Sequence, residues 1–463
     1  MYNRYMTHTS GEEFPRWRLD TSDLDVDALP VLCEADVVVV GSGAAGVAAA
    51  TVAAEGGLSV VIIEKYGFSG GAAVAGLSGT ICGLYLSAED QRRAPEQLVY
   101  GFTERFRGEL SAHGGLTAPQ LYGSTWTVAH DPLVWRETAD RLLERSGVRV
   151  LYHTNVIAPV TDADELCGVV VASNAGRSVV RARRVIDASG DAAVVARLGG
   201  GTVFGENGEI QNPTMFFRMA NVDTDAYQQF YGQDTICPPE VSAAIERARS
   251  EGAELPRSKI WIFRTPRHGE LLVNATRLTG RDGRMLNVID PEDFTEAEIY
   301  GRQQVRAYAR FLQEHVPGCA DAHVADTGVE AGIRQTRSIL GVETLRNTDV
   351  VACRKRPDGV VRSAWPIELH SGDRPKLHWL YDDYYEVPYH TLVPRIGENL
   401  IVAGRCLSAE HEALASARVT AQCFEYGHAA ATATLMSLET GDRYRDIEGA
   451  AVRERMRAAG SAL

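Results

Sequence analysis

The stretch EADVVVVGSGAAGVAAA, residues 34–50, decides the fold of this chain. Its first part, 35–40, is short, apolar and rich in β-branched residues, which is typical of a strand buried in a parallel sheet. Gly41 permits a tight turn, and Gly43 leaves room for a pyrophosphate to approach the backbone. Gly46 allows the following helix to lie close to the strand. The spacing of the three glycines therefore predicts a dinucleotide-binding turn.

The residues after the turn complete the same unit. Small residues at 44–54 predict a helix whose free N–H groups and positive dipole end suit a diphosphate. A second strand, LSVVIIE, ends on Glu64, which follows Gly46 by 18 positions. The acid that accepts a ribose hydroxyl is expected about 20 residues after the glycines. Together these features favour nucleotide binding over an ordinary strand-turn-helix unit.

Composition and charge exclude several classes of protein. The chain has 463 residues, enough for two sizeable domains, and a formal net charge of −14. No basic patch stands out, so a nucleic-acid partner is not expected. The first thirty residues are too polar for a signal peptide, and no apolar run is long enough to cross a bilayer. We therefore expect a cytoplasmic protein without a membrane partner; its oligomeric state is left open.

Cysteine and histidine spacing does not favour a metal centre. The eight cysteines are scattered without C-x-x-C spacing, so we expect reduced thiols and neither a zinc site nor a disulfide framework. The twelve histidines form no H-E-x-x-H pattern, and AEHEA around His411 is too compact for the helical metal spacings. We predict no metal.

Three separated segments carry a family resemblance: VVVVGSGAAGVAAATVAAEGGLSVVIIEKYGFSGGAA (37–73), RRVIDASGDAA (183–193) and GENLIVAGRCLSAEHEALASARV (397–419). Together they resemble the FAD-dependent oxidoreductases built on the glutathione-reductase type of Rossmann fold. AGIRQTRSILGVETL (331–345) and YYEVPYHTLVP (384–394) resemble one branch of that class. The resemblance spans roughly residues 34–440 and is specific for the flavin rather than for the substrate.

The resemblance implies an extended FAD that lies along several loops. Its pyrophosphate is expected at the start of the first helix, its adenosine ribose at Glu64, and its isoalloxazine ring between two domains. A second glycine loop at 69–71 and the turn at Gly190 and Asp191 are expected to support it. The cofactor-binding residues predicted in this way are Gly41, Gly43, Ala44, Gly46, Glu64, Lys65, Ser69, Gly70, Gly71, Gly190, Gly404 and Arg405.

The turn at Gly404-Arg405 departs from the Gly-Asp of the aromatic hydroxylases and the Gly-Glu common in the fumarate-reductase group, because a cation replaces an anion. A helix from about Ala413 is expected to direct its N-terminal dipole at the flavin pyrimidine ring, where negative charge accumulates on reduction. An ordinary packing helix is the alternative interpretation.

The fold class predicted is α/β, with a Rossmann-type FAD-binding domain of the glutathione-reductase-like kind and a second, discontinuous α+β substrate domain. The expected ranges are an N-terminal extension at 1–30, the first part of the FAD-binding domain at 31–200, the substrate domain at 201–390, the C-terminal part of the FAD-binding domain at 391–440 and a tail at 441–463.

The number of dinucleotide-binding motifs in the sequence indicates where the electrons that reduce the flavin come from. A second G-x-G-x-x-G after a strand is not found, so we expect electrons to come from the substrate by hydride transfer to flavin N5 and to leave to a separate acceptor. The leading prediction is a dehydrogenase or oxidase acting on a small organic molecule. The alternatives are a flavin monooxygenase supplied by a separate reductase and, in another class, a non-catalytic partner-binding protein of the same fold.

Several segments contain candidate catalytic residues. Arg334 and Arg337 are three positions apart, so on a helix they would share a face suited to a substrate carboxylate or to the flavin pyrimidine oxygens, with a surface salt-bridge pair as the alternative. His411 is predicted to be a general base whose pKa is raised by Glu410 and Glu412, with a helix-capping role as the alternative.

Tyr389 and His390 lie in a segment expected to return from the substrate domain toward the flavin, and for Tyr389 a packing role is favoured. Cys82 lies between Gly79 and Gly83 and is predicted to face the active-site cavity, where it could link to flavin, act as a thiolate base or fill an apolar gap.

Overall fold

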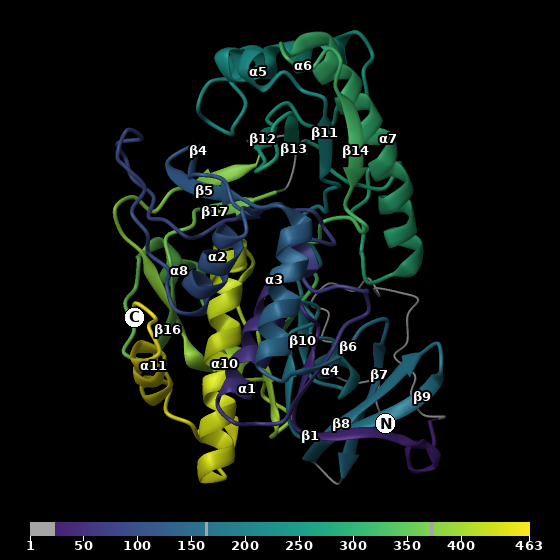
Figure 1. Cartoon of the computed structure of the whole chain (residues 1–463), viewed down its shortest axis with the longest axis vertical. Coiled ribbons are helices and arrows are strands. Elements are labelled where there is room, and N and C mark those ends of the chain that lie inside the picture. The colour runs from purple at the N-terminus through teal and green to yellow at the C-terminus, as the bar shows by residue number, and fades with distance from the viewer. Residues whose placement is uncertain (1–23, 163–164, 371–374) are drawn as a thin grey trace.

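Figure 1 shows the computed structural model of the chain, which describes residues 24–162, 165–370 and 375–463. Most of the predicted N-terminal extension, 1–30, lies outside the described residues. The remainder forms a mixed α/β structure whose centre is a mainly parallel sheet.

The parallel strands of this sheet come from distant parts of the chain. The sheet runs in the order β6-β2-β1-β9, with bounds β6 Arg149–Leu151, β2 Val60–Ile63, β1 Val31–Val40 and β9 Gly176–Asp187. The strand β20 (Leu400–Val402) pairs in parallel with the end of β9. The parallel Rossmann-like core predicted from the glycine motif is therefore confirmed.

A long antiparallel extension continues the sheet on the other side of β9. The strands β8 (Glu165–Ser173) and β7 (Asn155–Asp162) follow the first half of β9, while β20 takes the second half. The strands β7 and β8 thus belong to the same sheet as β1.

The register brings the functional segments to one edge. Val40 at the end of β1 lies opposite Ile63 of β2 and Asp187 of β9. The residues that follow these strands, Gly41, Glu64 and the turn at 188–191, therefore meet at the carboxyl edge of the sheet, where ligands of open α/β sheets bind.

Helices cover this core. Figure 1 shows α1 (Ala44–Glu55) and the long α10 (Thr420–Thr440) running together, with α2 (Phe102–Ala112) and α3 (Pro132–Arg145) beside them. The helix α3 begins with an Asp-Pro pair, and the Asp131 carboxylate caps it by accepting hydrogen bonds from Leu133 N and Val134 N at 2.8 and 3.1 Å. The shorter helices are α4 (Ala193–Arg197), α8 (Asn347–Val351), α9 (His411–Ala417) and α11 (Gly449–Ala458).

A second lobe lies at the top of Figure 1 and has its own hydrophobic core between residues 215 and 331. Its antiparallel sheet has the order β12-β13-β11-β14, with bounds β11 Phe217–Ala220, β12 Trp261–Arg264, β13 Glu270–Asn274 and β14 His323–Thr327. The helices that pack on it are α5 (Thr224–Tyr231), α6 (Pro239–Ser250) and α7 (Pro291–His315).

The range predicted for the substrate domain, 201–390, contributes to more than this lobe. Most buried apolar residues between 345 and 393 share the core of α1 and α10, whereas Trp365 packs in a small cluster with Trp261 and Phe263 of the second lobe. The remaining short strands are β3 (Thr80–Ile81), β4 (Gln120–Tyr122), β5 (Thr125–Ala129), β10 (Thr202–Phe204), β15 (Arg337–Ile339), β16 (Gly359–Ser363), β17 (Ile367–Leu369), β18 (Lys376–His378) and β19 (Tyr385–Pro388).

The expectation of a helix directed at the flavin from about Ala413 is wrong in one respect. The segment forms two helices, because α9 ends at Ala417 and α10 begins at Thr420 after Arg418 and Val419 leave the helical path. The N-terminus beside the central cavity belongs to α10, since Arg418, Val419 and Thr420 line that cavity.

The contact between α1 and α10 yields a stability prediction. A Cβ atom on Gly427 of α10 would lie 2.1 Å from the Ala45 carbonyl oxygen of α1, so Gly427→Ala should lower the free energy of unfolding by about 1–3 kcal/mol. Gly108→Ala in α2 is the matched control, because its Cβ would meet nothing within 4 Å. This control should be neutral or stabilising by up to about 1 kcal/mol. Urea unfolding that finds both variants equally stable would contradict the packing described.

Candidate functional site

A cavity extends from the carboxyl edge of the central sheet to the second lobe. Ten of the twelve residues predicted to bind the cofactor line it: Gly41, Gly43, Ala44, Glu64, Lys65, Gly70, Gly71, Gly190, Gly404 and Arg405. Gly46 and Ser69 do not line it and act behind its wall. The far end is lined by Tyr122, Phe216, Phe263, Trp365 and other residues of the second lobe and its connections.

The glycine turn after β1 depends on missing side chains. Gly41 has φ +92°, and a Cβ on Gly46 would lie 1.9 Å from the Gly41 carbonyl oxygen. Gly43 caps α1, and its own position faces the cavity. The first N–H groups of α1 are therefore presented to the cavity beside a backbone without side chains, which suits a diphosphate.

Glu64 holds this turn in place. One carboxylate oxygen accepts hydrogen bonds from Ser42 N at 2.8 Å and Ser42 Oγ at 3.1 Å, and the other accepts from Tyr66 N at 3.0 Å. The side chain is buried except where it lines the cavity. It thus shapes the backbone between Gly41 and Gly43; the ribose contact stays a prediction.

The second glycine loop packs directly on the first. Gly70 N donates to Ser42 O at 2.8 Å, and a Cβ on Gly71 would lie 2.9 Å from the Gly43 Cα. Ser69 is turned away, with its hydroxyl 2.9 Å from the Tyr152 hydroxyl. The two loops form one narrow cradle of backbone, and this cradle fits the pyrophosphate region of FAD.

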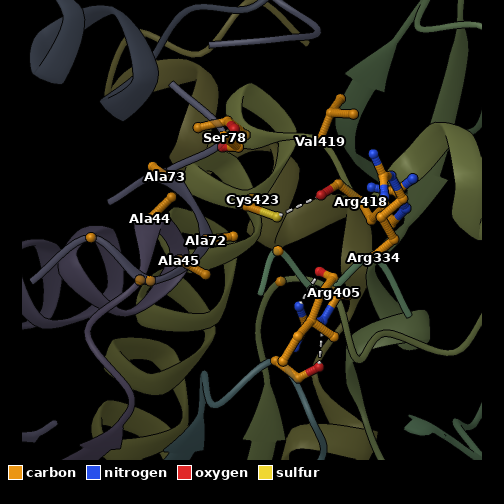
Figure 2. Close-up of a pocket in the computed structure, with 18 of the residues that line it drawn as sticks. Ala44, Ala45, Ala72, Ala73, Ser78, Arg334, Arg405, Arg418, Val419 and Cys423 are labelled. Atoms are coloured by element: carbon orange, nitrogen blue, oxygen red, sulfur yellow. Dashed lines mark hydrogen bonds between the residues drawn. The ribbon is translucent and has the colours of Figure 1, made fainter. Parts of the chain in front are cut away.

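Arg405 joins three loops around the cavity. It donates from Nε to Gly190 O at 2.9 Å, from Nη1 to Ile333 O at 2.5 Å and from Nη2 to the Asp191 carboxylate at 2.7 Å (Figure 2). Burial raises the pKa of Asp191, but the charge of Arg405 and a hydrogen bond from Thr336 lower it by more. The cation noted at this turn is therefore balanced within the protein.

The far end contains an acid and a base that no motif indicated. Tyr122 donates to a Glu368 carboxylate oxygen at 2.7 Å, and His370 Nε2 lies 3.5 Å from the same oxygen. Burial raises the pKa of Glu368, but His370, the Tyr122 hydrogen bond and Arg334 lower it to about 2. Burial and the charge of Arg334 hold the pKa of His370 well below 6.5. At neutral pH the pair is a carboxylate and a neutral imidazole.

Arg334 lies at this end, as predicted, although its setting differs. Its segment is not helical: Arg337 begins β15, so the expectation that Arg334 and Arg337 share a helix face is wrong. Arg334 Nη1 donates to Asn212 O at 2.9 Å, whereas Arg337 Nε donates to Asp191 O at 2.9 Å. Arg334 lines the cavity and Arg337 supports the turn behind it.

Cys82 lines the cavity, and so does Cys423, which the sequence did not single out. The Cys82 Sγ lies 3.3 Å from Thr80 Oγ1 and 3.7 Å from Thr127 Oγ1. Burial raises the pKa of Cys82 to about 11 and that of Cys423 to about 12. Both thiols are thus protonated at neutral pH, which disfavours a thiolate base at Cys82.

His411 is not among the residues that line the cavity. It begins α9, and burial lowers its pKa although Glu206 and Glu412 act to raise it. The expected upward shift is therefore wrong, because loss of hydration outweighs the acidic neighbours.

Tyr389 and His390 lie away from the cavity as well. Tyr389 is fully buried and donates to Tyr444 O at 2.9 Å, in line with the favoured packing role. Glu343, Asp358 and His390 place possible ligand atoms within 4.8 Å of one another. Arg356 pairs with both carboxylates, at 2.8 and 3.0 Å, which accounts for this cluster. The absence of a metal stays a prediction.

The fold and the double glycine cradle define a dinucleotide-binding protein, and comparison with known families specifies which kind. The family model described as FAD dependent oxidoreductase matches residues 36–456, so the chain belongs to that family. It is an FAD-dependent oxidoreductase, and its cofactor is FAD. The non-catalytic alternative is set aside.

Individual relatives are more distant. Thiamine thiazole synthase of Aeropyrum pernix is 32% identical over 173 residues, which are 35% of this chain. This chain thus spans 57% of that relative's length. A geranylgeranyl bacteriochlorophyll reductase-like protein from Thermoplasma acidophilum aligns over 92% of this chain and 82% of its own, with 15% identity and a TM-score of 0.46. The flavin-dependent brominase Bmp2 aligns over 92% and 84%, with 14% identity and a TM-score of 0.46.

Within residues 24–162, 165–370 and 375–463, no helix combines the length and the apolar character that a membrane span requires.

The cradle yields a test of cofactor binding. Glu64→Gln places an amide N–H₂ toward backbone donors, so the turn should distort and the Kd for FAD should rise at least about tenfold. Glu55→Gln is the control, since Glu55 is exposed at the opposite end of α1 and contacts Arg105 and Ser146 there. Fluorescence titration of the flavin-free protein measures both. Equal affinity for FAD in the two variants would contradict the role assigned to Glu64.

Proposed function

We propose that this protein is a dehydrogenase or oxidase that removes a hydride from a small organic substrate. The supporting observation is that one cavity joins the glycine cradle to an end where Tyr122, Glu368 and His370 form a hydrogen-bonded acid-base set. When bound, FAD supplies the hydride acceptor at its N5 position. The remaining tasks fall to side chains of the chain itself.

His370 is the proposed base. Its Nε2 is turned to the Glu368 carboxylate, which favours the tautomer with the proton on Nε2. Nδ1 then has a free lone pair, and in the described residues it has no hydrogen-bond partner. It can accept the proton that a hydroxyl or amine group of the substrate loses as the hydride leaves the adjacent carbon.

Glu368 and Tyr122 position that base. The carboxylate stabilises the imidazolium that forms on proton transfer, and the Tyr122 hydroxyl holds the carboxylate. Aromatic side chains around the pair exclude water, which strengthens these interactions. We also propose the glutathione-reductase-type arrangement of the cofactor domain, supported by the return of the chain as β20 beside β9.

An anaerobic substrate screen tests this function. The purified, FAD-loaded protein is mixed with amino acids, amines, alcohols and 2-hydroxy acids while its visible flavin absorbance is recorded. One of these classes should bleach the flavin and NADPH should not. Rapid bleaching by NADPH alone would contradict the proposed function. Incorporation of an oxygen atom from O₂ into product, with electrons from a separate reductase, would favour the monooxygenase alternative.

The assignment of the base yields a separate prediction. His370→Asn should lower kcat at least about a hundredfold with unchanged FAD content, because it removes the proton acceptor. In the wild type, kcat/KM should stay constant as pH falls through 6.5, since the lowered pKa keeps His370 neutral there. His411→Asn serves as the comparison and should retain activity. A loss of kcat in that variant alone, or a wild-type midpoint near pH 6.5, would contradict the assignment.

A further inference from the structure

The inner end of the cavity holds more positive than negative charge. Arg334 and Arg418 line it, and the one carboxylate among the described residues that line this end is Glu368. Arg334 Nη1 donates to the Asn212 carbonyl oxygen at 2.9 Å, and Arg418 Nη2 donates to the Gln211 amide oxygen at 2.8 Å. These acceptors are neutral, so the charge of the two guanidinium groups is not balanced by them.

A third arginine lies behind the first two. Arg257 is fully buried, and its three side-chain nitrogens have no hydrogen-bond partner within the part of the chain described. Burial lowers its pKa to about 10, which leaves it charged at neutral pH. Burial, Arg257 and Arg418 all lower the pKa of Arg334, because each neighbouring cation acts against the charge of this guanidinium group. Such a cluster is costly without an anion nearby.

The walls around the arginine pair are apolar and flat. Tyr122, Phe216, Phe263 and Trp365 line the same end, and the Tyr122 ring centroid lies 5.0 Å from that of Trp365 and 6.2 Å from that of Phe263. A phosphate or another small inorganic ion would leave these walls without a partner. A molecule with one anionic group and an apolar planar part would satisfy both.

This end is separate from the region that suits the cofactor's phosphates. Figure 2 shows Ala44, Ala45, Ala72 and Ala73 on one side of the cavity and Arg334 and Arg418 on the other, with Cys423 between them. The backbone N–H groups at the start of α1 can donate hydrogen bonds to the pyrophosphate. The arginines are thus available to another ligand.

We propose that the substrate is an organic carboxylic acid, held by its carboxylate between Arg334 and Arg418 with its planar apolar part against Tyr122 and Trp365. Planar guanidinium groups bind carboxylates through paired hydrogen bonds, which fixes the orientation of the acid. The carboxylate would offset the three neighbouring cations, and the rest of the molecule would lie beside His370. This assignment rests on the proposed function, which makes the cavity a substrate site.

Calorimetric titration of the FAD-loaded protein tests the proposal without turnover. Benzoate, benzamide and inorganic phosphate are titrated separately at one ionic strength. Benzoate and benzamide have the same ring and nearly the same shape, so the difference between them reports the negative charge. Benzoate should bind saturably with a Kd at least tenfold lower than those of benzamide and phosphate. Equal binding of benzoate and benzamide, or tighter binding of phosphate, would overturn the proposal.

Variants locate the bound acid. Arg418→Gln should raise the Kd for benzoate at least tenfold and leave that for benzamide unchanged, and Arg418→Lys should have a smaller effect because it keeps the charge but loses the paired donors. Arg302→Gln, which removes an exposed cation from α7, is the control and should bind benzoate as the wild type does. FAD content and thermal stability of each variant are measured alongside. An Arg418→Gln protein that holds FAD and binds benzoate unchanged would exclude the site.

The binding test and the substrate screen fail in different ways. Benzoate can bind selectively to a protein whose flavin no substrate bleaches, which would contradict only the proposed hydride transfer. A flavin bleached by neutral amines or alcohols, in a protein that does not distinguish benzoate from benzamide, would contradict only the carboxylate site.

Discussion

The structure depends on a contact that only glycine allows. A Cβ on Gly46 would lie 1.9 Å from the carbonyl oxygen of Gly41, and one on Gly427 would lie 2.1 Å from that of Ala45. Because Gly46 and Gly427 have no Cβ, α1 can lie directly against the turn after β1 on one side and against α10 on the other. The free N–H groups at the start of α1 are thereby fixed at the carboxyl edge of the sheet, and the cradle of the cofactor follows from that position.

The two ends of the cavity use different means to bind charge. At the cradle, the hydrogen-bond donors are backbone N–H groups, and the glycines leave space for a diphosphate. The diphosphate is therefore bound by oriented peptide dipoles rather than by mobile cationic side chains. At the inner end, Arg334 and Arg418 supply full charges in an apolar setting with Arg257 behind them. Arg405 also lines the cavity, but its guanidinium group is paired with the Asp191 carboxylate and donates hydrogen bonds to two carbonyl groups. The bound cofactor and the proposed substrate carboxylate are therefore held at separate places in the cavity.

The cofactor end could be predicted from sequence because it is local. The spacing of Gly41, Gly43, Gly46 and Glu64 predicted the first turn, and the family resemblance predicted the neighbouring loop at 69–71. The Rossmann-like sheet followed from the glycine motif, and the return of the chain near 400 followed from the segment at 397–419 and the family resemblance. Two predicted helices were wrong. The helix predicted from about Ala413 is interrupted at Arg418 and Val419, where no proline or glycine marks the break, and the composition of 331–337 does not exclude the helix that was expected there.

The inner end could not be predicted in this way, because it is assembled from segments far apart in the chain. Tyr122, Arg257 and His370 come from separate loops and strands, and none belongs to a recurring pattern. His411 attracted attention through its acidic neighbours in sequence, whereas burial lowered its pKa and the cavity lies elsewhere. A histidine's chemistry depends on its desolvation and on charges brought close by folding, and neither is visible in a single sequence.

A crystal structure of the FAD-loaded protein with benzoate would show whether one cavity holds both the cofactor on the glycine cradle and an organic acid at the arginine pair. We expect the pyrophosphate at Gly43 and Ala44 and the benzoate carboxylate within hydrogen-bond distance of Arg334 and Arg418. A pyrophosphate placed on those arginines, or benzoate bound outside the cavity, would contradict this expectation.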